Sequence, residues 1–351
     1  MSALLPPRSR ILRAPGDRVS LRIDLRTTSV CVGLLVAVLV IGAVATTTGD
    51  FRIPLLDVGK AIFGAGDPAT DFIVRTLRLP RFTTAVVAGA AMAVSGAIFQ
   101  NLSGNPLGSP DVIGFQTGAA TGALLVLLVT DDGPVELGAV TGCLVTAAAV
   151  YLLAFRGGVQ GFRMILIGIG INAMLVAANN YLITRASLQD ALGAQVWLVG
   201  SLNGRGWDQA LPTLGVLVVL LPIALAQNRR ASILQLGDEA AKGLGVPVER
   251  TRGLLIAVGV LLTGVAVAAA GPVTFVALAA PQLARRLTRS SAPGLVPAAL
   301  MGAVLLSGSD LLAQRLFSPE QLPVGIMTGA LGGAYLAWLL ASEWRRGRNR
   351  V

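Results

Sequence analysis

Residues 253–289 read GLLIAVGVLLTGVAVAAAGPVTFVALAAPQLARRLTR, and the number of times this stretch crosses a membrane decides the fold. Its apolar part covers about 32 residues, which is too long for one straight span of about 20 residues and too short for two complete ones. Arg250 and Arg252 precede the stretch, and three more arginines end it. Because loops rich in Lys and Arg remain in the cytoplasm, both flanks belong on one side, which requires an even number of crossings. We therefore predict a complete span followed by a shorter or partly re-entrant one, with the turn at Gly271-Pro272.

The other apolar runs extend this prediction to the whole chain. Together they give ten spans, at 28–47, 82–102, 112–130, 135–155, 164–183, 209–227, 253–270, 272–287, 294–317 and 323–342. With a cytoplasmic amino terminus, 20 of the 28 Lys and Arg residues then fall inside and 8 outside. The charge distribution supports an all-α integral membrane protein of about ten transmembrane helices, with both termini in the cytoplasm.

The composition agrees with a membrane protein. The chain has 351 residues, of which 54% are hydrophobic and only 13% charged, whereas soluble domains have about 25% charged residues. Its net charge of +10 comes mostly from residues that flank apolar runs, which favours the orientation of spans over binding to nucleic acid. The sequence has no histidine, and both cysteines lie in apolar runs, so we expect neither a metal site nor a disulfide framework. A metal cargo would arrive already chelated.

One transmembrane domain lies between two basic tails. Residues 1–27 indicate a cytoplasmic tail rather than a cleaved signal peptide. Residues 28–343 form the predicted transmembrane domain, including a cytoplasmic loop at about 228–252, and residues 344–351 form the second tail.

A charged stretch, QLGDEAAKGLGVPVERTR at residues 235–252, interrupts the apolar chain. Asp238 can cap a short helix that Gly243 or Gly245 can end, and Pro247 suits the first turn of a second helix. The pattern predicts two short helices joined by a sharp turn outside the membrane. Such a segment is either a well-capped solvated loop or a docking element for another protein, and the local sequence allows both.

Four blocks resemble the FecCD-type permease family, the membrane subunits of ABC importers for iron–siderophores, haem and cobalamin. In the family's order they are RTLRLPRFTTAVVAGAAMAVSGAIFQNLSGNPLGSPDVIG, LGDEAAKGLGVPVERTR, AAAGPVTFVALAAPQLARRL and SPEQLPVGIMTGALGGAYLAWLL. The resemblance implies a fold like that of a cobalamin-importer permease, a type II ABC importer, in the cytoplasmic membrane of a bacterium. It further implies a permease subunit that translocates an iron–siderophore complex.

The resemblance gives the charged loop a role. In this family the corresponding segment forms coupling helices that contact the ATPase subunit. The implied ATPase-coupling residues are Asp238, Glu239, Ala240, Ala241, Lys242, Gly243, Leu244 and Gly245. Because the sequence has no G-x-x-x-x-G-K-[ST] loop to hold phosphates, a separate ATPase subunit is expected to use the ATP and Mg²⁺. We expect this chain to bind no cofactor directly and to be no enzyme.

The resemblance also implies a contact on the outer side. Arginines at the family positions that match Arg78, Arg81 and Arg315 meet glutamates of the substrate-binding protein. The alternative is that these arginines only anchor the ends of spans. The expected partners are a second permease subunit (identical or homologous), two ATPase subunits, an extracytoplasmic siderophore-binding protein and membrane lipid.

Polar residues inside the spans suggest a path for the substrate. Asp310 is the most deeply placed acid of the apolar runs, and we assign it a structural role, facing the bundle or pairing with a cation such as Arg315. Uncharged polar residues either form interhelical hydrogen bonds or line a translocation path or gate. These residues are Gln100, Asn101, Asn105, Gln160, Gly161, Asn172, Asn179 and Asn180. Gln282 stands where the family often has histidine, so a pH-sensitive role at this position is not expected.

Two alternatives remain open. The chain could be a haem or cobalamin permease of the same family, or a secondary transporter driven by an ion gradient. A secondary transporter would be expected to have several buried acids or inverted repeats with broken helices, which the sequence does not indicate. The sequence identifies neither the chelate nor whether the second permease subunit is identical.

Overall fold

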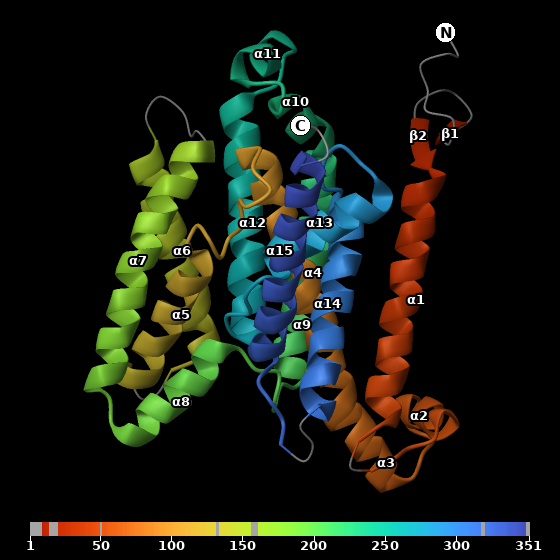
Figure 1. Cartoon of the computed structure of the whole chain (residues 1–351). Coiled ribbons are helices and arrows are strands. Elements are labelled where there is room, and N and C mark those ends of the chain that lie inside the picture. Colours follow the sequence, from red (N-terminus) through yellow and green to blue (C-terminus); the bar gives the residue numbers. More distant parts are fainter. Residues whose placement is uncertain are drawn as a thin grey trace.

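The computed structural model describes residues 9–13, 20–49, 51–130, 133–155, 161–316 and 320–348, and these residues are almost entirely helical (Figure 1). The long helices are α1 (Leu25–Thr47), α4 (Leu79–Ser103), α6 (Val135–Ala154), α7 (Gly161–Arg185), α9 (Trp207–Ala226), α12 (Val248–Ala270), α14 (Leu295–Arg315) and α15 (Val324–Arg348). The shorter ones are α2 (Leu55–Ile62), α3 (Pro68–Phe72), α5 (Phe115–Leu125), α8 (Leu188–Val199), α10 (Asn228–Leu234), α11 (Asp238–Gly243) and α13 (Val276–Thr288), with the π-helical turns η1 (Ile73–Arg78) and η2 (Val126–Thr130). Strands β1 (Ser9–Arg13) and β2 (Ser20–Asp24) pair antiparallel, a small exception to the all-α prediction that lies within the predicted basic tail.

Each of the ten predicted spans coincides with helix. Within the described residues, seven helical segments are long and apolar enough to cross a membrane. Two shorter apolar segments, Phe115–Thr130 and Val324–Trp338, match the third and tenth predicted spans. The remaining predicted span matches α13, which has only 13 residues.

The stretch 253–289 folds as its length and charges require. Helix α12 ends at Gly271, whose φ of 76° lies in the left-handed region, and Pro272 follows. An extended connection leads to Phe275, which also has a positive φ, before α13 begins. The chain therefore has a complete helix followed by a short one, and the predicted turn at Gly271-Pro272 is confirmed.

The two ends of the bundle are distinct (Figure 1). The beginning of α1 and the end of α15 lie at the same end as α10 and α11, whereas α2, α3 and α8 lie at the opposite end. We call the end with α10 and α11 the inner end and the opposite one the outer end. This arrangement agrees with the predicted topology, in which the charged loop and both tails share one side.

Helix α4 forms the centre of the bundle. Most of its side chains are buried, and it packs against α12, α13 and α14, whereas only three residues of α7 are buried. Small residues permit this packing, because a Cβ atom on Gly96 would overlap the carbonyl oxygen of Ala277 in α13 and one on Gly89 would overlap that of Gly302 in α14. Close backbone contact therefore fixes α4 against its neighbours.

Glycines four residues apart allow two helix backbones to approach closely, and two such pairs do so in α5 and α6. Gly118 and Gly122 of α5 face Gly138 and Gly142 of α6, with backbone against backbone. Gly329 and Gly333 of α15 have the same spacing but make no close backbone contact among the described residues. In α15 Gly332 contacts the side chain of Phe275, and Gly325 contacts the carbonyl group of Val199. The spacing alone does not determine which face of a helix meets a neighbour.

Candidate functional site

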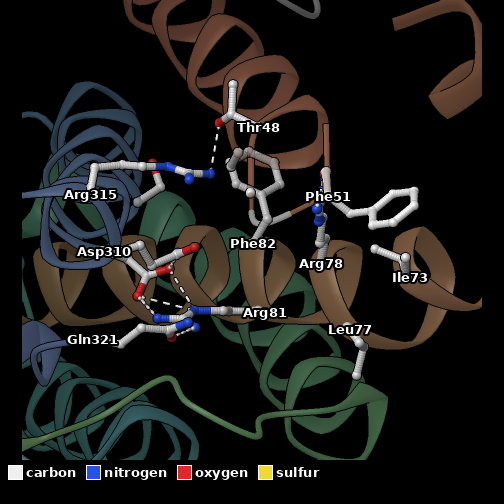
Figure 2. A pocket seen from close by; sticks show the side chains of 14 residues that line it. Thr48, Phe51, Ile73, Leu77, Arg78, Arg81, Phe82, Asp310, Arg315 and Gln321 are labelled. Carbon is white, nitrogen blue, oxygen red and sulfur yellow. Dashed lines mark hydrogen bonds and ion pairs between the residues drawn. The ribbon is translucent and has the colours of Figure 1, made fainter. Parts of the chain in front are cut away.

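The three arginines selected from the sequence lie around one cavity at the outer end. Arg78 and Arg81 belong to the junction of η1 and α4, and Arg315 is the last residue of α14. All three line a cavity of about 270 Å³, together with Asp310 and Gln321 (Figure 2). The fold thus brings together residues that are far apart in the sequence.

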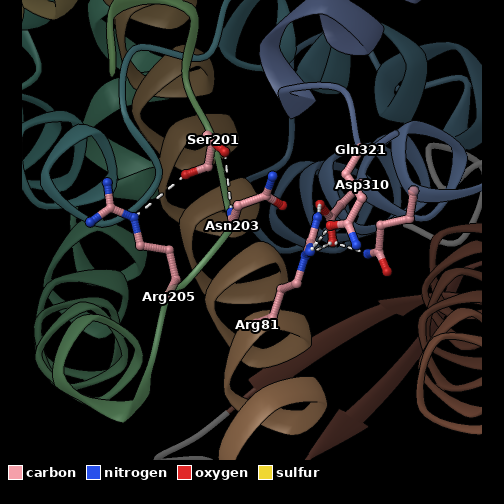
Figure 3. Close-up of polar contacts among 7 residues, drawn as sticks. Arg81, Ser201, Asn203, Arg205, Asp310 and Gln321 are labelled. Atoms are coloured by element: carbon pink, nitrogen blue, oxygen red, sulfur yellow. Dashed lines mark hydrogen bonds and ion pairs between the residues drawn. The ribbon is translucent and has the colours of Figure 1, made fainter. Parts of the chain in front are cut away.

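Asp310 is buried in α14, and its carboxylate is fully engaged. The side chains of Asp310 and Arg81 are 6% and 15% exposed. Arg81 Nη2 donates to Oδ1 at 2.8 Å and Arg81 Nε to Oδ2 at 3.0 Å, while Gln314 Nε2 donates to Oδ2 at 2.7 Å. The bidentate pair is drawn in Figures 2 and 3. This geometry agrees with a structural role for Asp310.

The partner suggested for Asp310 was wrong. Arg315 does not pair with this carboxylate; its Nη2 donates to the Thr48 hydroxyl of the segment after α1, at 2.9 Å. The helix explains the difference, because a residue five positions further on lies about 140° around the axis. Arg81 reaches Asp310 instead from the neighbouring helix α4.

The three arginines therefore have different surroundings. Arg81 also donates through Nη1 to Gln321 at 2.9 Å, so most of its hydrogen-bonding capacity is used within the chain. Arg78 donates to the carbonyl groups of Thr46 and Phe51, at 2.7 and 2.6 Å. These bonds connect the start of α4 to the end of α1. Hydrogen bonds within the chain thus fix the positions of all three arginine side chains around the cavity.

The loop between α8 and α9 adds polar groups that the sequence analysis did not select. Figure 3 shows Ser201, Asn203 and Arg205 beside the outer part of α4. Arg205 Nε donates to the Ser201 carbonyl group at 3.5 Å, and its guanidinium lies 3.8 Å from Glu136. Burial lowers the pKa of Arg205, and the Glu136 charge opposes that change. No motif in the sequence indicated that this loop would lie beside Arg81.

At the inner end, the charged stretch forms α11, but Asp238 does not cap it. Gly237 occupies the cap position with a φ of 98°, and no side chain makes a capping hydrogen bond there. Asp238 instead forms a bidentate pair with Arg252 of α12, at 2.7 and 3.2 Å. Its carboxylate is thereby used to compensate a guanidinium that is only 9% exposed.

The first of the two predicted short helices is confirmed as α11, but the second is not a separate short helix. The residues after the N-cap Pro247 belong to the 23-residue helix α12, and the other short helix of this region, α10, precedes α11. The predicted stop is confirmed, because α11 ends at Gly243 and the left-handed Gly245 donates to the Lys242 carbonyl group. Helix α11 is therefore connected to α12 by a tight turn.

Three of the eight residues proposed to line a path lie beside the α10–α11 segment. Gln100, Asn101 and Asn105 line an inner cavity of about 480 Å³ that Asp238 and Arg252 also line. The carboxamide of Gln282 enters the same cavity and donates to Gln100 Oε1 at 2.6 Å. Gly161 approaches the same region, because a Cβ atom there would lie 2.7 Å from Ser103 Cα at the end of α4.

The other proposed path residues lie elsewhere. Asn172 accepts a hydrogen bond from the Thr117 hydroxyl at 2.5 Å, between α7 and α5, which agrees with interhelical bonding. Asn179 is buried and Asn180 exposed on α7. Gln160 lies outside the described residues. The structure therefore does not gather the eight selected residues into one path.

A second carboxyl group is also partly buried. Asp111, in the connection between α4 and α5, has one oxygen that is buried without a hydrogen-bond partner among the described residues. The sequence argument treated Asp310 as the only deeply placed acid and so overlooked Asp111. The local sequence, NPLGSPDVIG, is rich in turn residues and gave no indication of burial.

The chain is similar to a known family of transport proteins in both sequence and structure. The model of the FecCD transport family matches residues 34–342. The chain is 46% identical to the ferric enterobactin transport system permease FepG of Escherichia coli over 318 residues, which covers 90% of this chain and 96% of that protein. It is 38% identical to a probable siderophore permease, YfhA of Bacillus subtilis, with 89% and 93% covered. A solved structure described as an inward-facing metal-chelate type ABC transporter superposes with a TM-score of 0.81 at 25% identity, covering 90% of this chain and 99% of that one.

Proposed function

The chain belongs to the FecCD transport family, and from this premise we propose that it moves a ferric siderophore through the cytoplasmic membrane. It is a multi-pass permease subunit of an ABC importer. The similarity to FepG over nearly the full length of both chains is the observation that supports an iron–siderophore cargo. Haem is the alternative that one relative favours, because the hemin permease HmuU of Yersinia pestis is 37% identical over 275 residues.

ABC importers work with ATPase and binding-protein partners, and we place these partners at opposite ends of the bundle. The ATPase subunits would contact α11 and its turn, Asp238 to Gly245, at the inner end. In this segment Glu239 has a 94% exposed side chain and Leu244 is 64% exposed, so charged and apolar groups are both available for a contact. ATP hydrolysis with Mg²⁺ would take place in those subunits, and residues 28–343 would form the permease domain, with basic tails at 1–27 and 344–351.

The binding protein would dock at the outer cavity. Arg78, Arg81 and Arg315 surround it with three positive charges, and Asp310 supplies one negative charge, so acidic groups of a partner would be attracted. Arg81 would serve mainly as a structural residue, because its guanidinium is occupied by Asp310 and Gln321. Acidic side chains of the binding protein would then pair mainly with Arg78 and Arg315.

The cargo is tested by uptake in a strain that lacks this gene. Cells complemented with the wild-type chain should accumulate radioactive iron from a ferric tricatecholate siderophore, and they should not do so after ATP is depleted. Hydroxamate and citrate chelates of iron, haem and cobalamin serve as competing substrates. Uptake of haem or cobalamin alone would contradict the proposed cargo, and uptake that persists without ATP would favour a secondary transporter.

The coupling surface is tested separately by charge reversal. Changing Asp238→Lys and Glu239→Lys together should abolish ATP-dependent uptake, because the start of α11 would then be basic and would repel any basic groups opposite it. Membrane insertion, measured by the amount of full-length protein in the membrane fraction, should remain normal. Unimpaired uptake would contradict the role of this segment.

A further inference from the structure

The attachment of α11 to the bundle has a polar part and an apolar part. The apolar part is a small cluster of Leu234, Ala241, Val246 and Val248, with Leu102 at the end of α4 packed against it. The polar part is the pair between Asp238 and Arg252, whose atoms Oδ1 and Nη2 are 2.7 Å apart. The apolar part joins Ala241 of α11 to Val248 at the start of α12, and the polar part joins α11 to Arg252, one turn further along α12.

Arg252 depends on this pair because it is buried. Its side chain is 9% exposed, and its Nε atom is buried without a partner among the described residues. Glu249 lies 3.5 Å from Arg252, but it belongs to the same helix and so cannot connect two elements. Removing the partner of a buried guanidinium is costly, and Asp238 is therefore held firmly against α12.

The same segment also contacts the central helix α4. Gln235, two residues before Gly237, donates from Nε2 to Asn101 Oδ1 at 3.1 Å. Asn101 in turn donates to the carbonyl group of Pro293, in the connection that leads to α14, at 3.2 Å. The α10–α11 segment thus reaches α4 through an exposed hydrogen bond between two side-chain amides and α12 through a partly buried ionic pair, and both contacts line one cavity.

From this geometry we propose that Arg252 is a positioning residue which transmits displacement of α11 to α12 through Asp238. The proposal rests on the proposed function, in which the ATPase subunits move α11. A short helix that is pushed can either slide over an apolar surface or carry its neighbour with it. The bidentate pair resists sliding, because both guanidinium–carboxylate contacts would have to break together. The motion of α11 then reaches the mostly buried helix α12, which packs on α4.

The test uses the complete importer in proteoliposomes, with the permease, ATPase and loaded binding protein, and ferric siderophore as substrate. Asp238→Asn should lower the number of substrate molecules transported per ATP hydrolysed by about 5- to 150-fold, the range of typical coupling between sites. Arg252→Met, which leaves α11 and its contact surface unchanged, should give the same loss, with basal ATP hydrolysis and co-purification of the ATPase retained. Asp238→Glu, which keeps the charge, should restore most of the coupling.

Two further variants separate coupling from stability. Glu249→Gln removes the same charge from beside the same arginine without touching the link between helices, so its transport per ATP should equal that of the wild type. The double variant Asp238→Asn with Arg252→Met removes the buried charge together with its partner, so it should fold normally and still be uncoupled. Normal coupling in this double variant, or equal losses in Glu249→Gln and Asp238→Asn, would overturn the proposal.

Failure of the proposed function gives a different result. If the wild-type chain does not co-purify with an ATPase, or transports the siderophore without ATP, the proposed function is wrong. If the wild type is coupled and Asp238→Asn is coupled equally well, the proposed function stands and only the role of Arg252 is refuted.

Discussion

The outer and inner ends of the bundle each contain a bidentate arginine–aspartate pair, and the two pairs differ in burial. At the outer end Arg81 and Asp310 have side chains that are only 15% and 6% exposed, and they join the long helices α4 and α14. At the inner end Arg252 is equally buried, but the side chain of Asp238 is 40% exposed and belongs to a six-residue helix. The outer pair therefore fixes the position of two helices, whereas the inner pair has one partner that another protein can reach.

The difference indicates how one interaction type can serve two purposes. A fully buried pair is expensive to break, because separation leaves an uncompensated charge in a low-dielectric environment. A pair with one exposed member is partly screened by solvent and can respond to a partner. The outer end of α4 is thus a fixed point, and the inner end is the place where motion can enter.

The largest effect is expected from breaking the outer pair. Asp310→Ala should lower the free energy of unfolding by about 3–5 kcal/mol, because the buried Arg81 guanidinium loses its counter-charge. Thermal unfolding in detergent measures this change. The double variant Arg81→Met with Asp310→Leu should regain most of the loss, and a double variant as unstable as Asp310→Ala would show that the pair is not the cause.

An intermediate effect is expected at the close contact of α4 with α13. This contact must be rigid if α4 is the fixed centre of the bundle. Gly96→Ala should cost about 1–3 kcal/mol of stability, because the new methyl group overlaps the Ala277 carbonyl oxygen. Gly170→Ala is the matched control on the exposed helix α7, where no atom lies within 4 Å of the added Cβ. The control should be neutral or slightly stabilising in the same unfolding assay, since Ala favours helix. Equal losses in the two variants would falsify the picture of α4 as the tightly packed centre.

The smallest effect concerns the salt dependence of the inner pair. Asp238→Asn should cost less than Asp310→Ala, at about 1–2 kcal/mol, because Asp238 is partly solvated and Glu249 remains near Arg252. Raising the salt concentration from about 0.1 to 1 M shortens the screening length from about 10 to 3 Å, so this cost should shrink. The cost of Asp310→Ala should not change with salt. If both costs fell equally, the two pairs would not differ in solvent access.

The sequence predicted much of the architecture but fewer of the contacts. All ten spans and the break at Gly271-Pro272 were predicted, because apolar length and flanking charge are local properties. The prediction that Asp238 caps a helix was wrong because it considered only neighbouring residues. A capping pattern is also local, but the buried Arg252, which the fold places beside Asp238, competes for the same carboxylate. Local rules therefore failed where a tertiary partner was available.

The sites show the same division. Arg78, Arg81 and Arg315 were selected through family resemblance, and the fold gathers them around one cavity. Their roles in partner docking remain predictions. Of the proposed path residues, Gln100, Asn101 and Asn105 meet at the inner end, because the end of α4 and the turn directly after it carry all three. The residues of α7 do not join them, because polarity in a span does not indicate which neighbour it will face.

The sequence by itself determined the class of the protein, the order of its membrane-spanning segments, and the side on which the charged loop lies. These properties follow from the cost of moving charges and unpaired backbone groups into a membrane, which each segment bears separately. Only the tertiary structure decided that Arg81 neutralises Asp310 and that Arg252 holds Asp238. The first pairing depends on which faces of α4 and α14 meet, and Gly89 and Gly302 set that geometry through close backbone contact between distant parts of the chain. The second depends on the tight turn that folds α11 back against α12.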